Sequence, residues 1–170
     1  HCSCSTTRTK KIKKLGQKIR VIIPAYNEAA AIGKVINHIP PCVNEIIVVN
    51  NNSSDNTEKI AQQSGATVLT EQKRGYGNAC LKGIEYLSYK TKKTDIVVFL
   101  DADFSDYPEE LTKITKPIIE KDIDSSKIQS IAGKAKIVIH SVGKINIKNR
   151  KKHLNEIIEL CKKINPDVIR

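Results

Sequence analysis

Residues 19–28 read Ile19-Arg20-Val21-Ile22-Ile23-Pro24-Ala25-Tyr26-Asn27-Glu28, and this stretch begins the fold. A run of β-branched residues stops at a proline, a pattern typical of a strand that is buried on both faces and ends in a turn. After Glu28, apolar residues recur at helical spacing until Pro40, so a helix is predicted to follow. We expect Asn27, or the residue beside it, to cap this helix, with Glu28 in its first turn.

The same unit of strand, polar loop and helix repeats along the chain. Further strands are predicted at 45–49, 67–69 and 95–100, and further helices at 57–64 and 78–89. Strands that alternate with helices at this spacing predict an α/β fold, a mostly parallel sheet with helices on both faces. Ligands of such sheets lie beyond the carboxyl ends of the strands. This rule selects four loops in advance: residues 24–28, 50–55, 72–78 and 101–107.

The composition predicts one globular domain. The chain has 170 residues, of which 39% are hydrophobic, and no apolar run approaches the roughly 18 to 20 residues that span a bilayer. Five cysteines are scattered without the spacing of a zinc site, as in reduced intracellular thiols. The N-terminus lacks the pattern of a secretion signal, so we expect a cytoplasmic location.

The positive charge is concentrated near the ends of the chain. The formal net charge is +11, residues 8–18 hold six basic residues and no acid, and residues 148–152 read KNRKK. Aromatic residues that would stack on bases are few, so no nucleic-acid partner is expected. A solvated tail and attraction to anionic lipid headgroups explain the basic ends equally well.

The strongest chemical signal is the stretch 97–103, Val-Val-Phe-Leu-Asp-Ala-Asp, in which an apolar strand delivers two carboxylates at its end. Two acids that share a site favour a cation, and Mg²⁺ or Mn²⁺ accepts carboxylate oxygens while keeping positions for water and phosphate. Asp101 and Asp103 are therefore the candidate metal ligands. The alternative is that these acids only begin the next loop and cap a helix.

Four motifs in this order and spacing make the chain similar to family 2 glycosyltransferases of the GT-A fold, and within them to dolichol-phosphate mannosyltransferases and other polyprenyl-phosphate glycosyltransferases. The resemblance covers about residues 19–124. Its motifs are Val21–Glu28, Ile47–Thr57, Arg74–Ala79 and Phe99–Asp103.

By this resemblance, Pro24, Tyr26 and Glu28 line a nucleotide pocket. A prolyl edge and an aromatic ring pack on a base or ribose, and a carboxylate accepts hydrogen bonds from ribose hydroxyls. Asn50 and Asn51 stand where the family usually has acids, so they bear on which base is bound. Asp55 matches the family, and it also suits a structural role as a helix N-cap.

The resemblance places Arg74 and Gly75 near a sugar diphosphate, where a cation and exposed backbone N–H groups favour an anion. It also implies inversion at the anomeric carbon, with Asp103 as the main metal ligand and Asp101 on ribose or metal. No general base is assigned.

Three segments are expected. Residues 1–18 form a flexible basic arm or expression remnant, residues 19–124 form the nucleotide-sugar-binding GT-A domain, and residues 125–170 form an unassigned basic tail with an amphipathic helix at 150–164. After residue 124 the family continues with an acceptor-binding segment that is not recognised here. We therefore expect that the acceptor-binding half is missing.

The sequence as a whole predicts a glycosyltransferase domain that binds a nucleotide diphosphate sugar through Mg²⁺ or Mn²⁺. The expected acceptor is a polyprenyl phosphate or a similar molecule at the cytoplasmic membrane surface. The alternative is a nucleotide-binding or membrane-surface module without turnover. A nucleotidyltransferase would need a Gly-rich phosphate loop directly after the first strand, and residues 24–28 do not form one.

Overall fold

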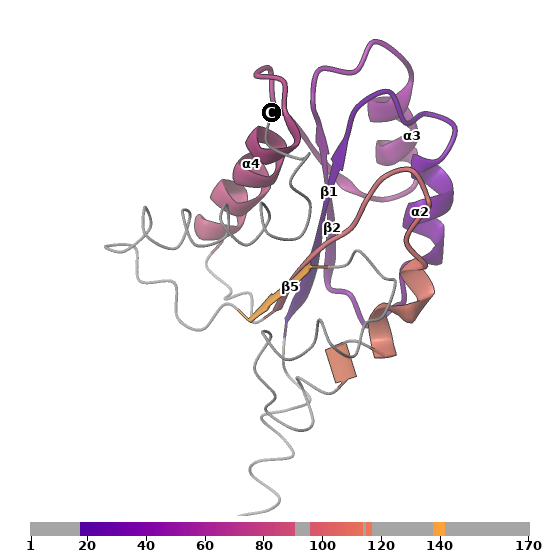
Figure 1. Ribbon diagram of the computed structural model, residues 1–170, viewed down its shortest axis with the longest axis vertical. Helices are drawn as coiled ribbons and strands as arrows, with labels where there is room; N and C mark the ends of the chain where they lie inside the picture. The colour runs from indigo at the N-terminus through magenta and orange to yellow at the C-terminus, as the bar shows by residue number, and fades with distance from the viewer. Residues whose placement is uncertain (1–17, 91–95, 114, 117–137, 142–170) are drawn as a thin grey trace, which may run out of the picture.

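The computed structural model describes residues 18–90, 96–113, 115–116 and 138–141 of the chain (Figure 1). Its elements are, in chain order, β1 (Ile19–Ala25), α2 (Ile32–His38), β2 (Glu45–Asn50), α3 (Thr57–Gln63), β3 (Thr67–Thr70), α4 (Tyr76–Ser88), β4 (Ile96–Phe99), the 3₁₀ turn η1 (Pro108–Glu110) and β5 (Val138–Ser141). Among these described residues, no helix has the length and hydropathy of a membrane span.

The strands form one sheet in the order β3-β2-β1-β4-β5. β1 pairs with β2 and β4 in parallel, and β2 pairs with β3 in parallel. β5 runs antiparallel to β4. The strand predicted at 95–100 is one residue shorter at each end, and the mostly parallel sheet expected from the sequence is confirmed.

β5 lies in the part of the chain that the sequence left as an unassigned tail after residue 124. Its pairing, with Val98 opposite Ile139, adds residues 138–141 to the sheet. The basic arm at residues 1–17 and the helix expected at 150–164 lie outside the described residues, so they stay predictions.

Helices cover both faces of the sheet, with α2 and α3 on one side and α4 on the other (Figure 1). Alternate residues of β1 point to opposite faces, as the pleat of a strand requires. Val21 and Ile23 pack with α2 and α3, whereas Ile22 packs with α4. Strands with apolar residues on both faces are typical of parallel sheets, which explains why β1 is apolar except at Arg20. The buried Arg20 pairs with Glu45 of β2 at 3.0 Å.

α4 approaches β1 closely at a glycine. Gly83 is buried, and a Cβ atom built there would lie 2.7 Å from Cγ2 of Ile22. The missing side chain therefore sets the separation of helix and sheet, and with it the position of the amino end of α4.

α2 begins later than the sequence suggested. Its N-cap is Ala31, without a side-chain hydrogen bond, so the expected capping by Asn27 is wrong. Asn27 has a positive φ of 54°, a conformation that Asn tolerates better than most residues. Glu28 precedes the helix, and its carbonyl accepts hydrogen bonds from the N–H groups of Ala31 and Ile32. Residues 26–29 consequently form a loop beyond the carboxyl end of β1 and not the first turn of α2.

Candidate functional site

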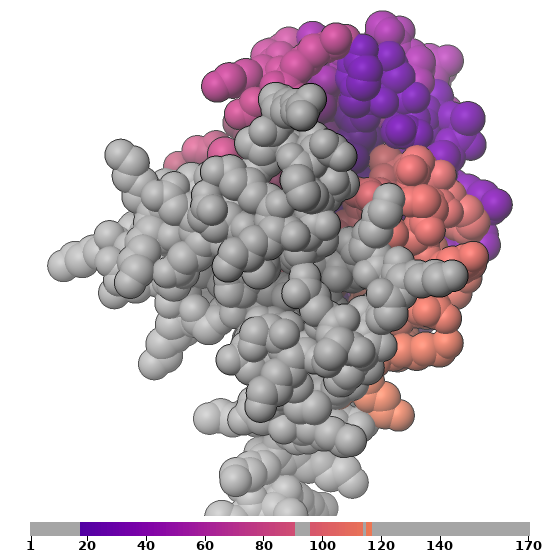
Figure 2. Space-filling model, viewed as in Figure 1, coloured from indigo at the N-terminus to yellow at the C-terminus, as the bar shows by residue number. Residues whose placement is uncertain are grey.

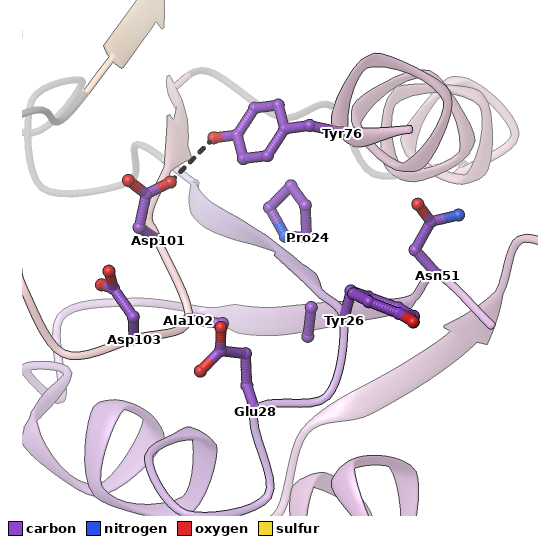
Figure 3. A pocket seen from close by; sticks show the side chains of 9 residues that line it. Pro24, Tyr26, Glu28, Asn51, Tyr76, Asp101, Ala102 and Asp103 are labelled. Carbon is purple, nitrogen blue, oxygen red and sulfur yellow. Dashed lines mark hydrogen bonds between the residues drawn. The ribbon is translucent and has the colours of Figure 1, made fainter. Parts of the chain in front are cut away.

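A pocket of about 340 Å³ lies beyond the carboxyl ends of β1 and β4, beside the amino end of α4 (Figure 3). It is lined by Pro24, Ala25, Tyr26, Glu28, Asn51, Tyr76, Asp101, Ala102 and Asp103. Most of the site residues expected from the sequence are therefore brought together. The exceptions are Asn50, Arg74 and Gly75, which do not line the pocket.

One side of the pocket is acidic. Figure 3 shows the carboxylates of Asp101, Asp103 and Glu28 around the same space. Partial burial raises the pKa of Glu28, and the negative charges of Asp103, Asp55 and Asp101 raise the pKa further. A cation in this space would relieve the repulsion among these carboxylates.

The donors on this side suit a hard divalent ion, because carboxylate oxygens are ligands that Mg²⁺ and Mn²⁺ prefer. Over the described residues, no group of three or more His, Cys, Asp and Glu side chains is arranged to hold a metal ion. Within the described part of the chain, Asp101 and Asp103 thus offer only part of a coordination shell. Such a site fits an ion that brings phosphate oxygens and water as its other ligands.

Asp101 and Asp103 are fixed by the loop that follows β4. The Tyr76 hydroxyl donates a hydrogen bond to Oδ1 of Asp101 at 3.1 Å (Figure 3). The Asp101 N–H donates to the buried carboxylate of Asp106 at 3.2 Å. Oδ1 of Asp103 accepts from the N–H of Ser105 at 2.9 Å. The Asp103 carboxylate is therefore oriented by its own loop, whereas the Asp101 carboxylate is oriented by Tyr76 of α4.

Phe104, the residue after Asp103, anchors this loop to α2. Its φ is 64°, which is unusual for a bulky residue. The Lys34 ammonium lies 4.0 Å from the centre of its ring, and the His38 ring meets it edge-on at 5.0 Å. The segment after β4 accordingly lies against the segment that contains α2 (Figure 2). These contacts stabilise the turn that places Asp103 at the pocket.

The opposite side of the pocket carries Tyr26, whose side chain is 42% exposed. The Arg74 guanidinium stacks over its ring, with Cζ 4.3 Å from the ring centre, and donates a hydrogen bond to the Tyr26 hydroxyl. The sequence placed Arg74 beside a diphosphate. In the structure, its guanidinium lies over the ring of Tyr26, and its place near a diphosphate stays a prediction.

The two asparagines at the end of β2 have different roles from one another. Asn50 is buried, donates to Glu58 at 2.8 Å and accepts from the N–H of Ser53 at 3.0 Å, so its side chain supports the loop before α3. Asn51 does line the pocket, but its side chain also bonds the loop that carries Arg74.

The loops after β1 and β2 are joined by hydrogen bonds. The Glu28 N–H donates to the Thr57 hydroxyl at 2.8 Å, and the Ala29 N–H donates to Oδ2 of Asp55 at 3.1 Å. Oδ1 of Asp55 accepts from the N–H of Thr57 at 2.9 Å, which satisfies the start of α3. The N-cap of α3 is Asn56, so the expected N-cap role of Asp55 is wrong. The Asp55 carboxylate instead joins the Glu28 loop to the first residue of α3.

Three pocket residues were not expected from the sequence, namely Ala25, Ala102 and Tyr76, and only Tyr76 has a polar side chain. It stood inside a matched motif, between Gly75 and Gly77, but nothing in the spacing indicated that its hydroxyl reaches Asp101. The two residues are 25 positions apart. The available signal was topological, because α4 begins at the sheet edge where β4 ends.

Comparison with known proteins gives consistent results. A sequence model described as glycosyl transferase family 2 matches residues 20–166. An uncharacterized glycosyltransferase of Mycobacterium tuberculosis is 31% identical over 119 residues, which are 69% of this chain and 52% of the relative. An uncharacterized protein of Methanocaldococcus jannaschii is 34% identical over 110 residues, 63% of this chain and 44% of that protein. The chain thus spans about half the length of these relatives.

Solved structures of glucosyl-3-phosphoglycerate synthase from Mycobacterium tuberculosis are also similar. One contains Mn²⁺, uridine diphosphate and glucosyl-3-phosphoglycerate, and another contains Mg²⁺ and uridine diphosphate. Each has a TM-score of 0.55 and 31% sequence identity, and the match covers 71% of this chain and 46% of that chain. The expected α/β fold is confirmed.

Proposed function

Because the chain belongs to glycosyl transferase family 2 and has its GT-A fold, we propose that the pocket binds a nucleotide diphosphate sugar with Mg²⁺ or Mn²⁺. The whole protein would then be an inverting glycosyltransferase. The observation that carries this proposal is the convergence of Asp101, Asp103 and Glu28 on one pocket whose other side is aromatic. A carboxylate side suits a metal with its diphosphate, and an aromatic side suits a nucleoside.

Six of the nine lining residues are assigned roles from their positions in the pocket. Asp103 and Asp101 would hold the ion, and a bound ion would offset the negative charge that develops on the leaving diphosphate. Pro24 and Tyr26 present apolar surface to the base or ribose. Glu28 accepts hydrogen bonds from ribose hydroxyls, and Tyr76 keeps Asp101 in orientation. A general base for the acceptor is not assigned among these residues.

Isothermal titration with uridine diphosphate, with and without Mn²⁺, tests the proposal. We expect metal-dependent binding that chelator removes and that Asp103→Asn weakens by about tenfold or more. Glu109→Gln is the matched control, since it also removes one exposed carboxylate charge from the segment after β4 but lies outside the pocket. Equal binding with and without metal, or equal losses in both variants, would remove the metal site from the proposal.

We propose a phosphate-bearing acceptor, specifically a polyprenyl phosphate at the cytoplasmic membrane surface. The basic stretches at residues 8–18 and 148–152 support attraction to anionic headgroups. One structure of the similar mycobacterial synthase contains phosphoglyceric acid, which is also an anionic phosphate. A radiolabelled-sugar assay of the whole protein with polyprenyl phosphate and with 3-phosphoglycerate separates the two acceptors. Donor binding without transfer to either would favour the alternative of a module without turnover.

A further inference from the structure

We infer that Asn51 is a positioning residue that latches loop 71–75 beside the pocket, and that its amide does not read the nucleotide base. This inference rests on the proposed nucleotide site. It concerns the part of that site where the chain has an amide in place of the acid usual in the resembled family.

The side chain of Asn51 is committed to the loop on both of its polar atoms. Nδ2 donates to the carbonyl oxygen of Glu71 at 3.0 Å and to that of Lys73 at 2.8 Å. Oδ1 accepts from the N–H of Gly75 at 2.8 Å. The residue is only 5% exposed, and its own N–H donates to the carbonyl of Ala25 in β1 at 2.8 Å. Both amide protons are therefore used within the protein.

An amide is required at this position. An asparagine offers two N–H donors and an acceptor, which match two carbonyl groups and one N–H group. A carboxylate has no donor, so Asp at position 51 would place negative charge against the oxygens of Glu71 and Lys73. A buried acceptor left against another acceptor is costly. The loop would have to move away from the pocket.

The latched loop connects to both sides of the pocket. Gly75 has a φ of 127°, a conformation that side-chain-bearing residues rarely adopt, and it leads directly into Tyr76. Tyr76 bonds Asp101 on the acidic side, whereas Arg74 stacks on Tyr26 on the other. Release of the loop should consequently lower the affinity for every nucleotide by a similar factor, whichever base the nucleotide carries.

The experiment compares Asn51→Asp and Asn51→Ala with the control Asn52→Asp. Asn52 is the next residue, is exposed and has a φ of 62°, which Asp also tolerates. Hydrogen exchange of the peptide that contains residues 71–75 reports the latch directly. Titration with the diphosphates of uridine, guanosine, adenosine and cytidine, each with Mn²⁺, reports base selection. Asn51→Ala lacks the added repulsion and decides the question if the Asp variant does not fold.

We expect exchange at Gly75 to rise by about tenfold in both Asn51 variants, with Kd rising by one common factor and the order of the bases unchanged. Asn52→Asp should leave the exchange at Gly75, the Kd values and the order of the bases unchanged. A changed order of bases, or unchanged exchange, would overturn the inference. If the wild-type protein binds none of the nucleotides, the proposed function fails, and exchange alone then supports or overturns the latch.

Discussion

Removal of the hydrogen bond from Tyr76 to Asp101 tests whether that bond positions the acidic side of the pocket. Tyr76→Phe keeps the ring and removes the hydroxyl that donates to Oδ1 of Asp101 at 3.1 Å. A hydrogen bond to a charged group contributes about 1.5–3 kcal/mol, and the lower end applies to this partly buried contact. About 1.5 kcal/mol corresponds to roughly a tenfold rise in the Kd of uridine diphosphate with Mn²⁺.

The assay is titration calorimetry of the wild type and the variant, with Mn²⁺ and with chelator. Tyr86→Phe is a matched control, because Tyr86 also lies in α4 and its hydroxyl also donates to a carboxylate, Oε1 of Glu45 at 2.8 Å. That contact lies at the amino end of β2, away from the pocket. We expect Tyr86→Phe to lower the stability of the protein and to leave nucleotide binding unchanged.

If Tyr76→Phe binds the nucleotide and metal as tightly as the wild type, the hydroxyl does not position Asp101. Tighter binding would show that the hydroxyl competes with the cation for the carboxylate, which would also refute the reasoning. If Tyr76→Phe loses as much affinity in chelator as with Mn²⁺, then Tyr76 acts on nucleotide binding directly and not through the metal ligand Asp101.

Three further predictions concern stability. Gly83→Ala places a Cβ 2.7 Å from Cγ2 of Ile22. Overpacking costs about 1–3 kcal/mol, which outweighs a gain of about 1 kcal/mol in helix propensity over most of that range. Urea denaturation should therefore show a lower free energy of unfolding, and the loss should disappear in an Ile22→Ala background. An unchanged stability would contradict this reading of the contact. Burial raises the pKa of Glu45, but hydrogen bonds from Tyr86, Lys90 and Arg20 together hold the pKa below its usual 4.5. The wild type should therefore be more stable than Glu45→Gln above pH 4.5 and lose this advantage as the pH falls further, and a constant difference would be the opposing result. Burial and the charges of nearby carboxylates raise the pKa of Glu28, so its ionised form costs stability above pH 4.5. Glu28→Gln should melt at a higher temperature than the wild type at pH 7 while binding nucleotide and metal more weakly, and a lower melting temperature would contradict it.

Much of the fold was predictable because its signals are local. The β-branched run that ends at Ile23 and the helical spacing before Pro40 each depend on neighbouring residues, and both elements are present. The start of α2 was wrong for a nonlocal reason. Asn27 bonds across to Ser53 and Ser54 instead of capping its own helix, and no pattern in residues 24–32 reveals partners about 26 positions away.

The candidate site shows the same division. Asp101, Asp103 and Glu28 follow strands, and the rule for parallel sheets was sufficient to bring them together. The orientation of Arg74 was not predictable, because it depends on the distant ring of Tyr26. The contacts of Asn50 with Glu58 and Ser53 were equally hidden, since a terminal strand residue can point toward ligand or toward its own loop.

The hydrogen bonds that join residues 27–29 to residues 53–57 bear on the thermodynamics of ligand capture. These loops bind one another through hydrogen bonds of Asn27, Asp55 and Thr57, all of them between groups of the protein itself. Flexible loops lose conformational entropy when they bind a ligand, and this cost opposes binding. In this protein the two loops lose that entropy when the chain folds. The pocket is preorganised on this side, and a larger share of the contact energy with a ligand is retained as affinity.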